Sequence, residues 1–199
     1  MSTERVPESY LSGLMYGERR EALLRAVVTV VARDGLRSLT YRRLAKQAGV
    51  SHGLIAHHFG SIDNLLGPAL ELSIEDTVAG LELIPPSSDV DDFAADLLTG
   101  IVPQAENLTF QYEVMLEGRQ AVGMSGIVKH LNDRYRGIVA TALRKMRVAH
   151  DDGMVELVYA ALEGIVFHQL VHEESDANER ALERLRSLLR ASRCELDAV

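Results

Sequence analysis

Apolar residues recur every three or four positions along most of the chain, which predicts amphipathic helices. The spacing indicates about nine of them, near residues 18–33, 40–48, 51–59, 61–83, 89–102, 105–121, 125–148, 152–173 and 176–196. No strand-like alternation of apolar and polar residues interrupts this pattern. Residues 1–16 follow no sustained period, and we expect a flexible N-terminal arm there. The predicted fold class is therefore all-α.

Turn and capping residues indicate where the first helices begin and end. Thr40 is a good N-cap residue, and Gly49 can adopt the left-handed conformation that a tight turn requires. Ser51 is expected to cap the next helix. Gly67-Pro68 lies inside the longer helix and removes a backbone donor, so we expect an interruption and a kink there. Such a kink is either a hinge or a fixed bend.

The two short helices around Gly49 have the properties of a helix-turn-helix. Their expected inward-facing residues are Leu44, Ala45, Ala48, Val50 and Ile55. A helix-turn-helix presents its second helix to the DNA major groove. An ordinary corner between two helices also uses a small residue and a glycine, so this spacing alone leaves both possibilities open.

Charge is distributed unevenly along the chain. Of the net charge of −8, residues 1–67 contribute nine Lys or Arg against six Asp or Glu, and the remainder contributes twelve against twenty-three. A basic first part joined to an acidic body suggests that only the first part meets a polyanion. The single cysteine, Cys194, cannot form an intrachain disulfide. With no apolar run of about 20 residues and no signal peptide, we expect a cytoplasmic protein without membrane contact.

The stretch LTYRRLAKQAGVSHGLIAHHFGSIDNLL, residues 39–66, resembles the DNA-binding domain of TetR-family repressors. The agreement covers Thr40, Ala45, the AGVS run 48–51, Gly53, Ile55, His58, Phe59, Ser61 and Leu65. The chain carries Ala56 and Ile62 where the family commonly has tyrosine and lysine. The resemblance implies a helix-turn-helix DNA-binding domain over residues 17–62 and a ligand-binding and dimerisation domain over residues 63–199.

The resemblance also assigns roles to individual residues. Thr40 and His58 match phosphate-binding positions, Arg42 matches a base-reading position, and His57 flanks the recognition helix. The implied DNA-binding residues are Thr40, Tyr41, Arg42, Lys46, Ser51, His52, Gly53, Leu54, His57 and His58. A metal site is disfavoured here, because His57 and His58 diverge by about 100° on a helix. We expect neither a metal nor another cofactor.

The body of the chain is expected to hold a small-molecule effector and to form a homodimer. Aromatic, Met and charged residues on two apolar helices make the pocket candidates Tyr112, Met115, Arg119, Tyr159, Glu163 and Phe167. Each of them could instead be core or solvated. The last two helices, residues 152–196, carry apolar faces that include Leu182, Leu185, Leu189 and Leu196. These faces either complete the monomer core or form a four-helix dimer interface, which the resemblance favours.

The function expected from these features is a ligand-responsive transcriptional regulator, a repressor that binds a palindromic DNA operator as a dimer. A small-molecule effector would release it from DNA. Segments of the chain also look similar to choline-responsive repressors of the betaine pathway. One alternative is a helix-turn-helix-derived interaction module with weak or lost DNA binding, which Ala56 and Ile62 keep open. The other is an all-helical enzyme using His168 or Glu163, but no paired motif supports it, and we expect no enzyme.

Overall fold

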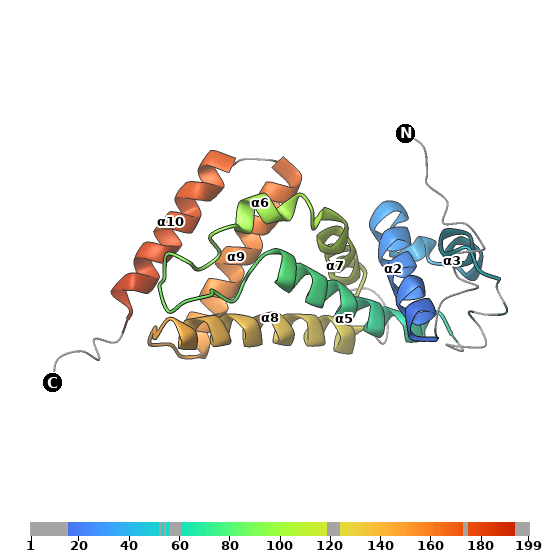
Figure 1. Ribbon diagram of the computed structural model, residues 1–199, viewed down its shortest axis with the longest axis horizontal. Helices are drawn as coiled ribbons and strands as arrows, with labels where there is room; N and C mark the ends of the chain where they lie inside the picture. The colour runs from blue at the N-terminus through green and yellow to red at the C-terminus, as the bar shows by residue number, and fades with distance from the viewer. Residues whose placement is uncertain are drawn as a thin grey trace. The chain divides into compact units, whose positions relative to one another are not determined.

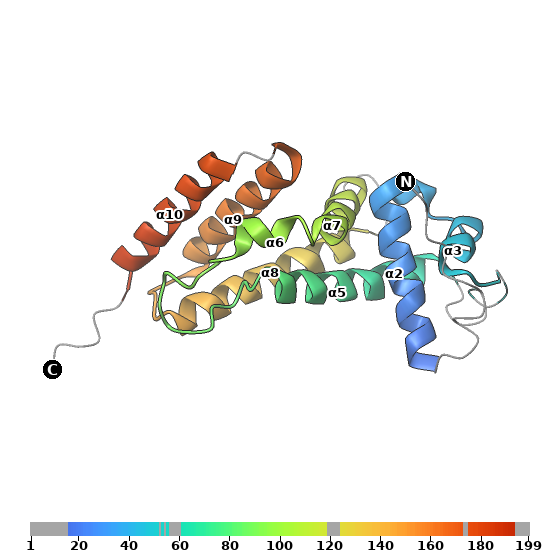
Figure 2. The same ribbon diagram turned by 45° about the horizontal axis from the view of Figure 1, so that its top comes forward.

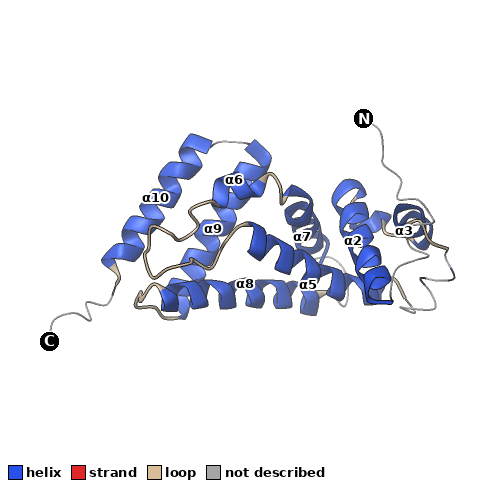
Figure 3. Ribbon diagram, in the orientation of Figure 1, coloured by secondary structure: helices blue, strands red, loops and turns tan. Residues whose placement is uncertain are grey.

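The computed structural model describes residues 16–51, 53, 55, 61–118, 124–172 and 175–193, and all of its regular elements are helices (Figures 1 and 3). The helices are α2 (Tyr16–Asp34), α3 (Tyr41–Ala48), α5 (Asp63–Gly80), α6 (Leu97–Ile101), α7 (Ala105–Gly118), α8 (Ser125–Lys145), α9 (Asp152–His172) and α10 (Ser175–Ala191). A short 3₁₀ turn, η1, covers Leu36–Ser38. The predicted all-α class is confirmed.

The chain divides into two compact units. The first contains residues up to Asp76 together with Glu106–Val128, and the second contains Thr77–Ala105 together with the residues from Lys129 onward. Helices α5 and α8 therefore contribute residues to both units.

The first unit is built around the apolar face of α2, which packs against α3. Leu23, Val27 and Val31 of α2 are at most 1% exposed, and Leu44 of α3 and Ile55 are fully buried. Ala45 and Ala48 are also buried, whereas Val50 is only half-buried. The predicted burial is therefore confirmed for every residue of the set except Val50. Arg25 of α2 pairs with Asp76 of α5 at 2.6 Å. The buried apolar face of α2 therefore holds α3 in place against it.

The predicted N-cap of α3 and the glycine turn at its C-terminus are confirmed. The Thr40 side chain accepts a hydrogen bond from the backbone N–H of Arg43 at 3.3 Å, which satisfies one of the free donors of the first turn. Gly49 ends α3 with φ of 66°, in the left-handed region that glycine reaches without steric cost. The expected cap at Ser51 begins a segment of which only residues 53 and 55 are described, both of them helical.

Helix α5 is continuous through Gly67-Pro68, so the predicted interruption is wrong. The helix also begins and ends inside the predicted range 61–83. One of its faces is buried at Leu65, Leu66, Ala69 and Leu70, each at most 6% exposed. Burial of four apolar side chains stabilises the helix by more than the roughly 3 kcal/mol that an internal proline costs. Whether these two residues act as a hinge stays a prediction.

The predicted helix over residues 89–102 is wrong for most of its length. Residues 91–96 form turns, and α6 covers only five residues. The hydroxyl of Ser87 accepts from the N–H of Asp89, and the Asp89 carboxylate accepts from the N–H of Asp91, at 2.8 and 3.1 Å. Such local bonds compete with helix formation. Ala94 then takes a φ of 53°, which no right-handed helix allows.

In the second unit, α9 packs against α6 and α10, and the last two helices lie side by side (Figure 2). The sequence spacing also predicts one apolar stripe on α8 made of Ile127, Leu131, Tyr135, Ile138, Val139, Ala142 and Met146. All of these residues are buried except Ile127 and Tyr135, which are half-buried. Leu182, Leu185 and Leu189 of α10 are at most 6% exposed, so they fill the core of their own chain. The dimer interface predicted from these leucines is therefore wrong in its residues. Leu196 lies outside the described part of the chain.

Helix α9 is long and apolar enough, by length and composition, to cross a membrane. A segment of this kind was not expected from the sequence. The helix carries seven buried residues and packs against two other helices, as the core helix of a water-soluble protein does. Its composition is therefore weak evidence for a membrane span.

Candidate functional site

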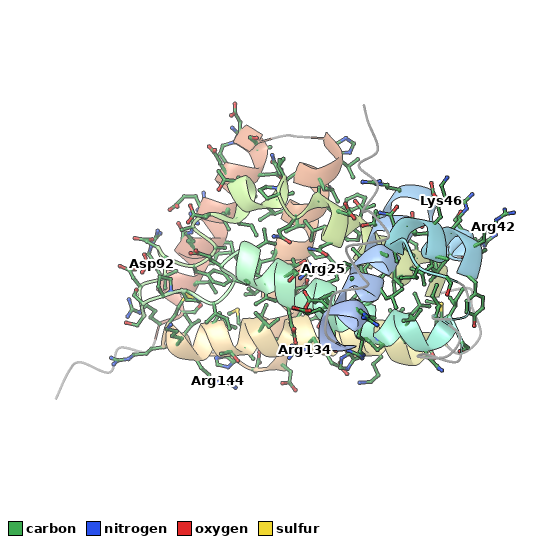
Figure 4. All side chains as sticks on the ribbon, turned by 45° about the vertical axis from the view of Figure 1, so that its right-hand side comes forward. Arg25, Arg42, Lys46, Asp92, Arg134 and Arg144 are labelled. Carbon is green, nitrogen blue, oxygen red and sulfur yellow. The ribbon has the colours of Figure 1, made fainter. Side chains whose placement is uncertain are left out.

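The cationic side chains of α3 differ in whether they already form an ion pair within the chain. The guanidinium of Arg43 pairs with the carboxylate of Asp34 at 2.6 Å. Its neighbour Arg42 and the nearby Lys46 are exposed, and their side chains point away from the ribbon (Figure 4). Among the described residues, neither Arg42 nor Lys46 makes a hydrogen bond or an ion pair. Their charges are therefore available to an external anion.

The other predicted DNA-binding residues are only partly described. Thr40 is exposed and caps α3, Tyr41 is half-buried, and Ser51 and the helical Gly53 are exposed. No described atom lies within 4 Å of a Cβ built on Gly53. His52, Leu54, Ala56, His57 and His58 lie outside the described residues. The described residues of the set thus lie at the surface, except for the half-buried Tyr41.

A second group of interacting polar and aromatic side chains joins α8 to α9. The hydroxyl of Tyr159 donates to the side-chain oxygen of Asn132 at 2.9 Å. Arg136 binds the carboxylate of Glu156 through Nε and Nη2, at 2.5 and 3.0 Å, and its guanidinium lies 5.5 Å from the Tyr159 ring centre. The ring of Tyr135 stacks on that of Tyr159 with 6.3 Å between centres. We call these five residues the α8–α9 cluster.

Burial changes the acidity of two groups in this region. It raises the pKa of the Tyr159 phenol, with a smaller contribution from the Glu163 charge. It also raises the pKa of the half-buried Glu163 carboxyl, against the opposing effect of the Arg136 charge. The hydrogen bond from Arg136 lowers the pKa of the exposed Glu156 carboxyl. The cluster therefore holds one firmly ionised pair, and it lies beside one carboxyl that burial makes harder to ionise.

Two family models match the chain over most of its length. The model described as bacterial regulatory proteins, tetR family, matches residues 23–67. The model described as tetracyclin repressor-like, C-terminal domain, matches residues 85–191, which is more than half of the chain. The chain belongs to the TetR family.

Known relatives of this TetR-family chain are similar over different parts of it. The HTH-type transcriptional regulator BetI of Stenotrophomonas maltophilia is 42% identical over 52 residues, which span 26% of each chain. A TetR-family regulator from Rhodococcus sp. has a TM-score of 0.70 at 23% identity and covers 88% of this chain and 98% of its own. A regulator from Saccharomonospora viridis in complex with choline has a TM-score of 0.59 at 18% identity, covering 87% and 96%. At these identities the structures show a shared fold.

The predicted pocket residues of the TetR-family body fall into two groups. Tyr112 and Met115 are half-buried on α7 in the first unit, and Arg119 lies outside the described residues. Tyr159, Glu163 and Phe167 follow one another at four-residue intervals on α9, and exposure rises from 9% at Tyr159 to 41% at Phe167. The structure thus brings the last three together in one row on α9.

Sequence reasoning missed the α8 side of the cluster. The sequence pattern does not single out Asn132 and Arg136, and it marks Tyr135 only as part of an apolar stripe. The positions of Asn132 and Tyr135 along α8 do not predict these contacts, because their partner Tyr159 lies on another helix. Also missed was an open groove of about 480 Å³, lined by Ile84 and by His130, Asp133, Arg134, Gly137, Ile138 and Thr141 of α8.

Proposed function

We propose that the chain is a ligand-responsive transcriptional repressor that binds a palindromic DNA operator as a homodimer. Residues 17–62 form its DNA-binding domain, and residues 63–199 bind a small-molecule effector and the partner subunit. The observation that carries the proposal is the pair of exposed cations, Arg42 and Lys46, on the helix that precedes the glycine turn. The TetR-family membership supports it.

The two cations are suited to different contacts with DNA. The planar fork of an arginine matches the O6 and N7 acceptors of guanine in the major groove. A lysine ammonium is a point charge that neutralises a phosphate without reading sequence. Arg42 thus contributes to sequence preference and Lys46 to overall affinity. Arg43, already paired with Asp34, contributes mainly to the fold.

Binding by the full chain tests this assignment. A duplex enriched by repeated selection from random DNA serves as the operator, and an unselected duplex of equal length serves as the reference. Arg42→Ala should reduce the preference for the enriched duplex by roughly 5- to 150-fold, the equivalent of about 1–3 kcal/mol. Lys46→Ala should weaken both duplexes alike and reduce the logarithmic salt slope by about 1.

Arg43→Ala is the matched control, since it removes the same charge one residue along the helix. It should leave the preference and the salt slope close to those of the unaltered chain. An affinity for DNA that does not fall when the salt concentration is raised several-fold would count against DNA as the partner and favour an interaction module. Equal effects of Arg42→Ala and Arg43→Ala would remove the distinction drawn between the two arginines.

The homodimer is assigned to a surface different from the leucines of the α10 core. Large apolar side chains remain exposed on the outer faces of the last two helices, at Leu157, Phe167 and Val171 of α9 and Leu188 of α10. Exposed large apolar side chains on two adjacent helices are typical of a helix-bundle interface between subunits. Phe167 thereby moves from the effector pocket, where the sequence pattern placed it, to the dimer surface.

The body of the protein is the proposed effector-binding region, and its candidate residues are Tyr112, Met115 and Arg119 of the first unit and, separately, Tyr159 and Glu163 of the second. The similarity to BetI spans too little of the chain to carry an effector over. A quaternary amine binds best over free aromatic faces. In the α8–α9 cluster the guanidinium of Arg136 already lies over the Tyr159 ring, and Tyr135 stacks on it. This packing argues against a choline cage at Tyr159.

A further inference from the structure

Three glutamates lie on one side of α7, at Glu106, Glu113 and Glu117. Their spacing of seven and four residues follows the helical period, which brings their side chains to the same face of the helix. Helix α7 belongs to the first unit, together with α2, η1 and α3. A Cβ built on Gly35, directly after α2, would lie 3.4 Å from Oε2 of Glu113. The glutamate row therefore faces the end of α2.

The two outer glutamates of the row bind side chains of α2 and η1. The hydroxyl of Thr29 on α2 donates a hydrogen bond to the carboxylate of Glu106. Nε of Arg37 in η1 donates to the carboxylate of Glu117 at 2.9 Å. Helix α7 lies beside α2 in both ribbon views (Figures 1 and 2). The carboxylates of α7 thus hold α2 and the turn that leads into α3.

Helix α7 is itself anchored on another face by buried hydrogen bonds to α5. Nε2 of Gln111 donates to Oγ of Ser73 at 2.9 Å, and this hydroxyl donates to the backbone carbonyl of Asn107 at 3.2 Å. Ser73 is fully buried and Gln111 is 4% exposed. Breaking such bonds leaves buried polar groups without water or a partner, which costs more than breaking a surface bond. The position of α7 is therefore fixed independently of its contacts with α2.

We propose that Glu106 and Glu117 of α7 are positioning residues for the DNA-binding surface of α3. They act through α2 and η1, because η1 ends two residues before the N-cap of α3, Thr40. Their bonds set the orientation in which α3 presents Arg42 to DNA. This inference rests on the proposed repressor function and adds that DNA recognition depends on a helix from the second half of the sequence.

Amide hydrogen exchange of the full chain without DNA tests the contact between α7 and η1. Glu117→Arg and Arg37→Glu each place two like charges together, and each should make the amides of residues 36–48 exchange about two- to fivefold faster. The chain with both substitutions restores an ion pair of reversed polarity, and its exchange should return toward that of the unaltered chain. Thr29→Val removes the donor to Glu106 at nearly the same volume and should also accelerate exchange.

Preference for the enriched duplex over the unselected one is the second readout. Glu117→Arg and Arg37→Glu should each lower this preference by about two- to fivefold per subunit, and the charge-swapped chain should recover it. Using the ratio removes the effect of the altered net charge, which changes the affinity for both duplexes. If Arg37 itself bound a phosphate, the swapped chain would bind both duplexes more weakly and would not recover, which would overturn the positioning role.

Asp91→Arg is the matched control, since it breaks an exposed ion pair with Arg190 that also joins segments far apart in the sequence. It should leave the exchange of residues 36–48 and the duplex preference unchanged. The proposal is overturned if the charge-swapped chain exchanges as fast as the two single substitutions together predict. If the unaltered chain prefers no duplex, the repressor function fails, while hydrogen exchange still decides whether α7 positions α3.

Discussion

Leu157→Glu should dissociate the proposed homodimer without unfolding the chain. Leu157, Phe167, Val171 and Leu188 are 59%, 41%, 52% and 55% exposed. Complete burial of such a side chain is worth about 1.5–3 kcal/mol, so burying the exposed half contributes about 1 kcal/mol each. Counted on both subunits, the patch supplies roughly 8 kcal/mol before the entropic cost of association.

In a two-fold symmetric interface each substitution occurs twice. Leu157→Glu therefore removes about 2 kcal/mol of apolar burial, which weakens the dimer by about 30-fold, and the desolvation of two carboxylates adds to this. Sedimentation equilibrium over a micromolar concentration series measures the dissociation constant. Circular dichroism of the same samples shows whether the helices remain.

Two further variants test whether the dissociation is specific to this surface. Leu116 is 66% exposed on α7, so Leu116→Glu is a matched control that should leave the dissociation constant unchanged. Leu185 is 6% exposed, so Leu185→Glu should unfold the chain by burying a charge in its core. The assignment of the dimer surface is refuted if the unaltered chain is a monomer at these concentrations, or if Leu157→Glu dimerises as tightly as Leu116→Glu.

Two other substitutions test the effector region and helix α5. Glu163→Gln should raise the free energy of unfolding near pH 7, because burial raises the pKa of Glu163 and native ionisation is therefore unfavourable. The gain should vanish below about pH 4, where Glu163 is protonated in both folded and unfolded states; a gain that is the same at both pH values in urea unfolding contradicts this sign. Gly67→Ala adds a Cβ that meets nothing within 4 Å, and it should stabilise α5 by about 0.5–1 kcal/mol. If Gly67-Pro68 is a hinge, Gly67→Ala combined with Pro68→Ala should also change DNA affinity several-fold; unchanged affinity at increased stability identifies a fixed bend.

The sequence predicted the helices with a buried apolar face correctly at α2 and α8. It failed at residues 89–102, where apolar spacing is helical but the chain turns. There, Arg186 of α10 donates to the carbonyls of Phe93 and Ala94 at 3.0 and 2.9 Å. A partner 92 residues away thus satisfies backbone groups that a helix would have satisfied locally. No local pattern contains that contact.

Sequence-based prediction meets the same limit at the candidate site, where tertiary contacts decide which side chains are available. Periodicity places Arg42 and Arg43 side by side on one short helix, and only the structure shows that Asp34 engages Arg43 and not Arg42. Likewise, an apolar stripe on α10 predicts burial, but it does not say whether the chain itself or a second copy covers it. The leucines of α10 are covered by the chain itself, so the dimer proposal uses the exposed apolar residues of α9 and α10 instead.

Gly164 gives an independent argument for a partner on that outer face. Glycine in the middle of a helix costs about 1 kcal/mol relative to alanine, and it lets a neighbouring helix approach more closely than any other residue does. Gly164 is exposed on α9, and a Cβ built there meets nothing within 4 Å. Packing within the described part of the chain therefore does not require it. At helical spacing it shares the exposed side of α9 with Leu157 and Val171, so the proposed partner helix could approach closely over that face while covering the exposed apolar side chains.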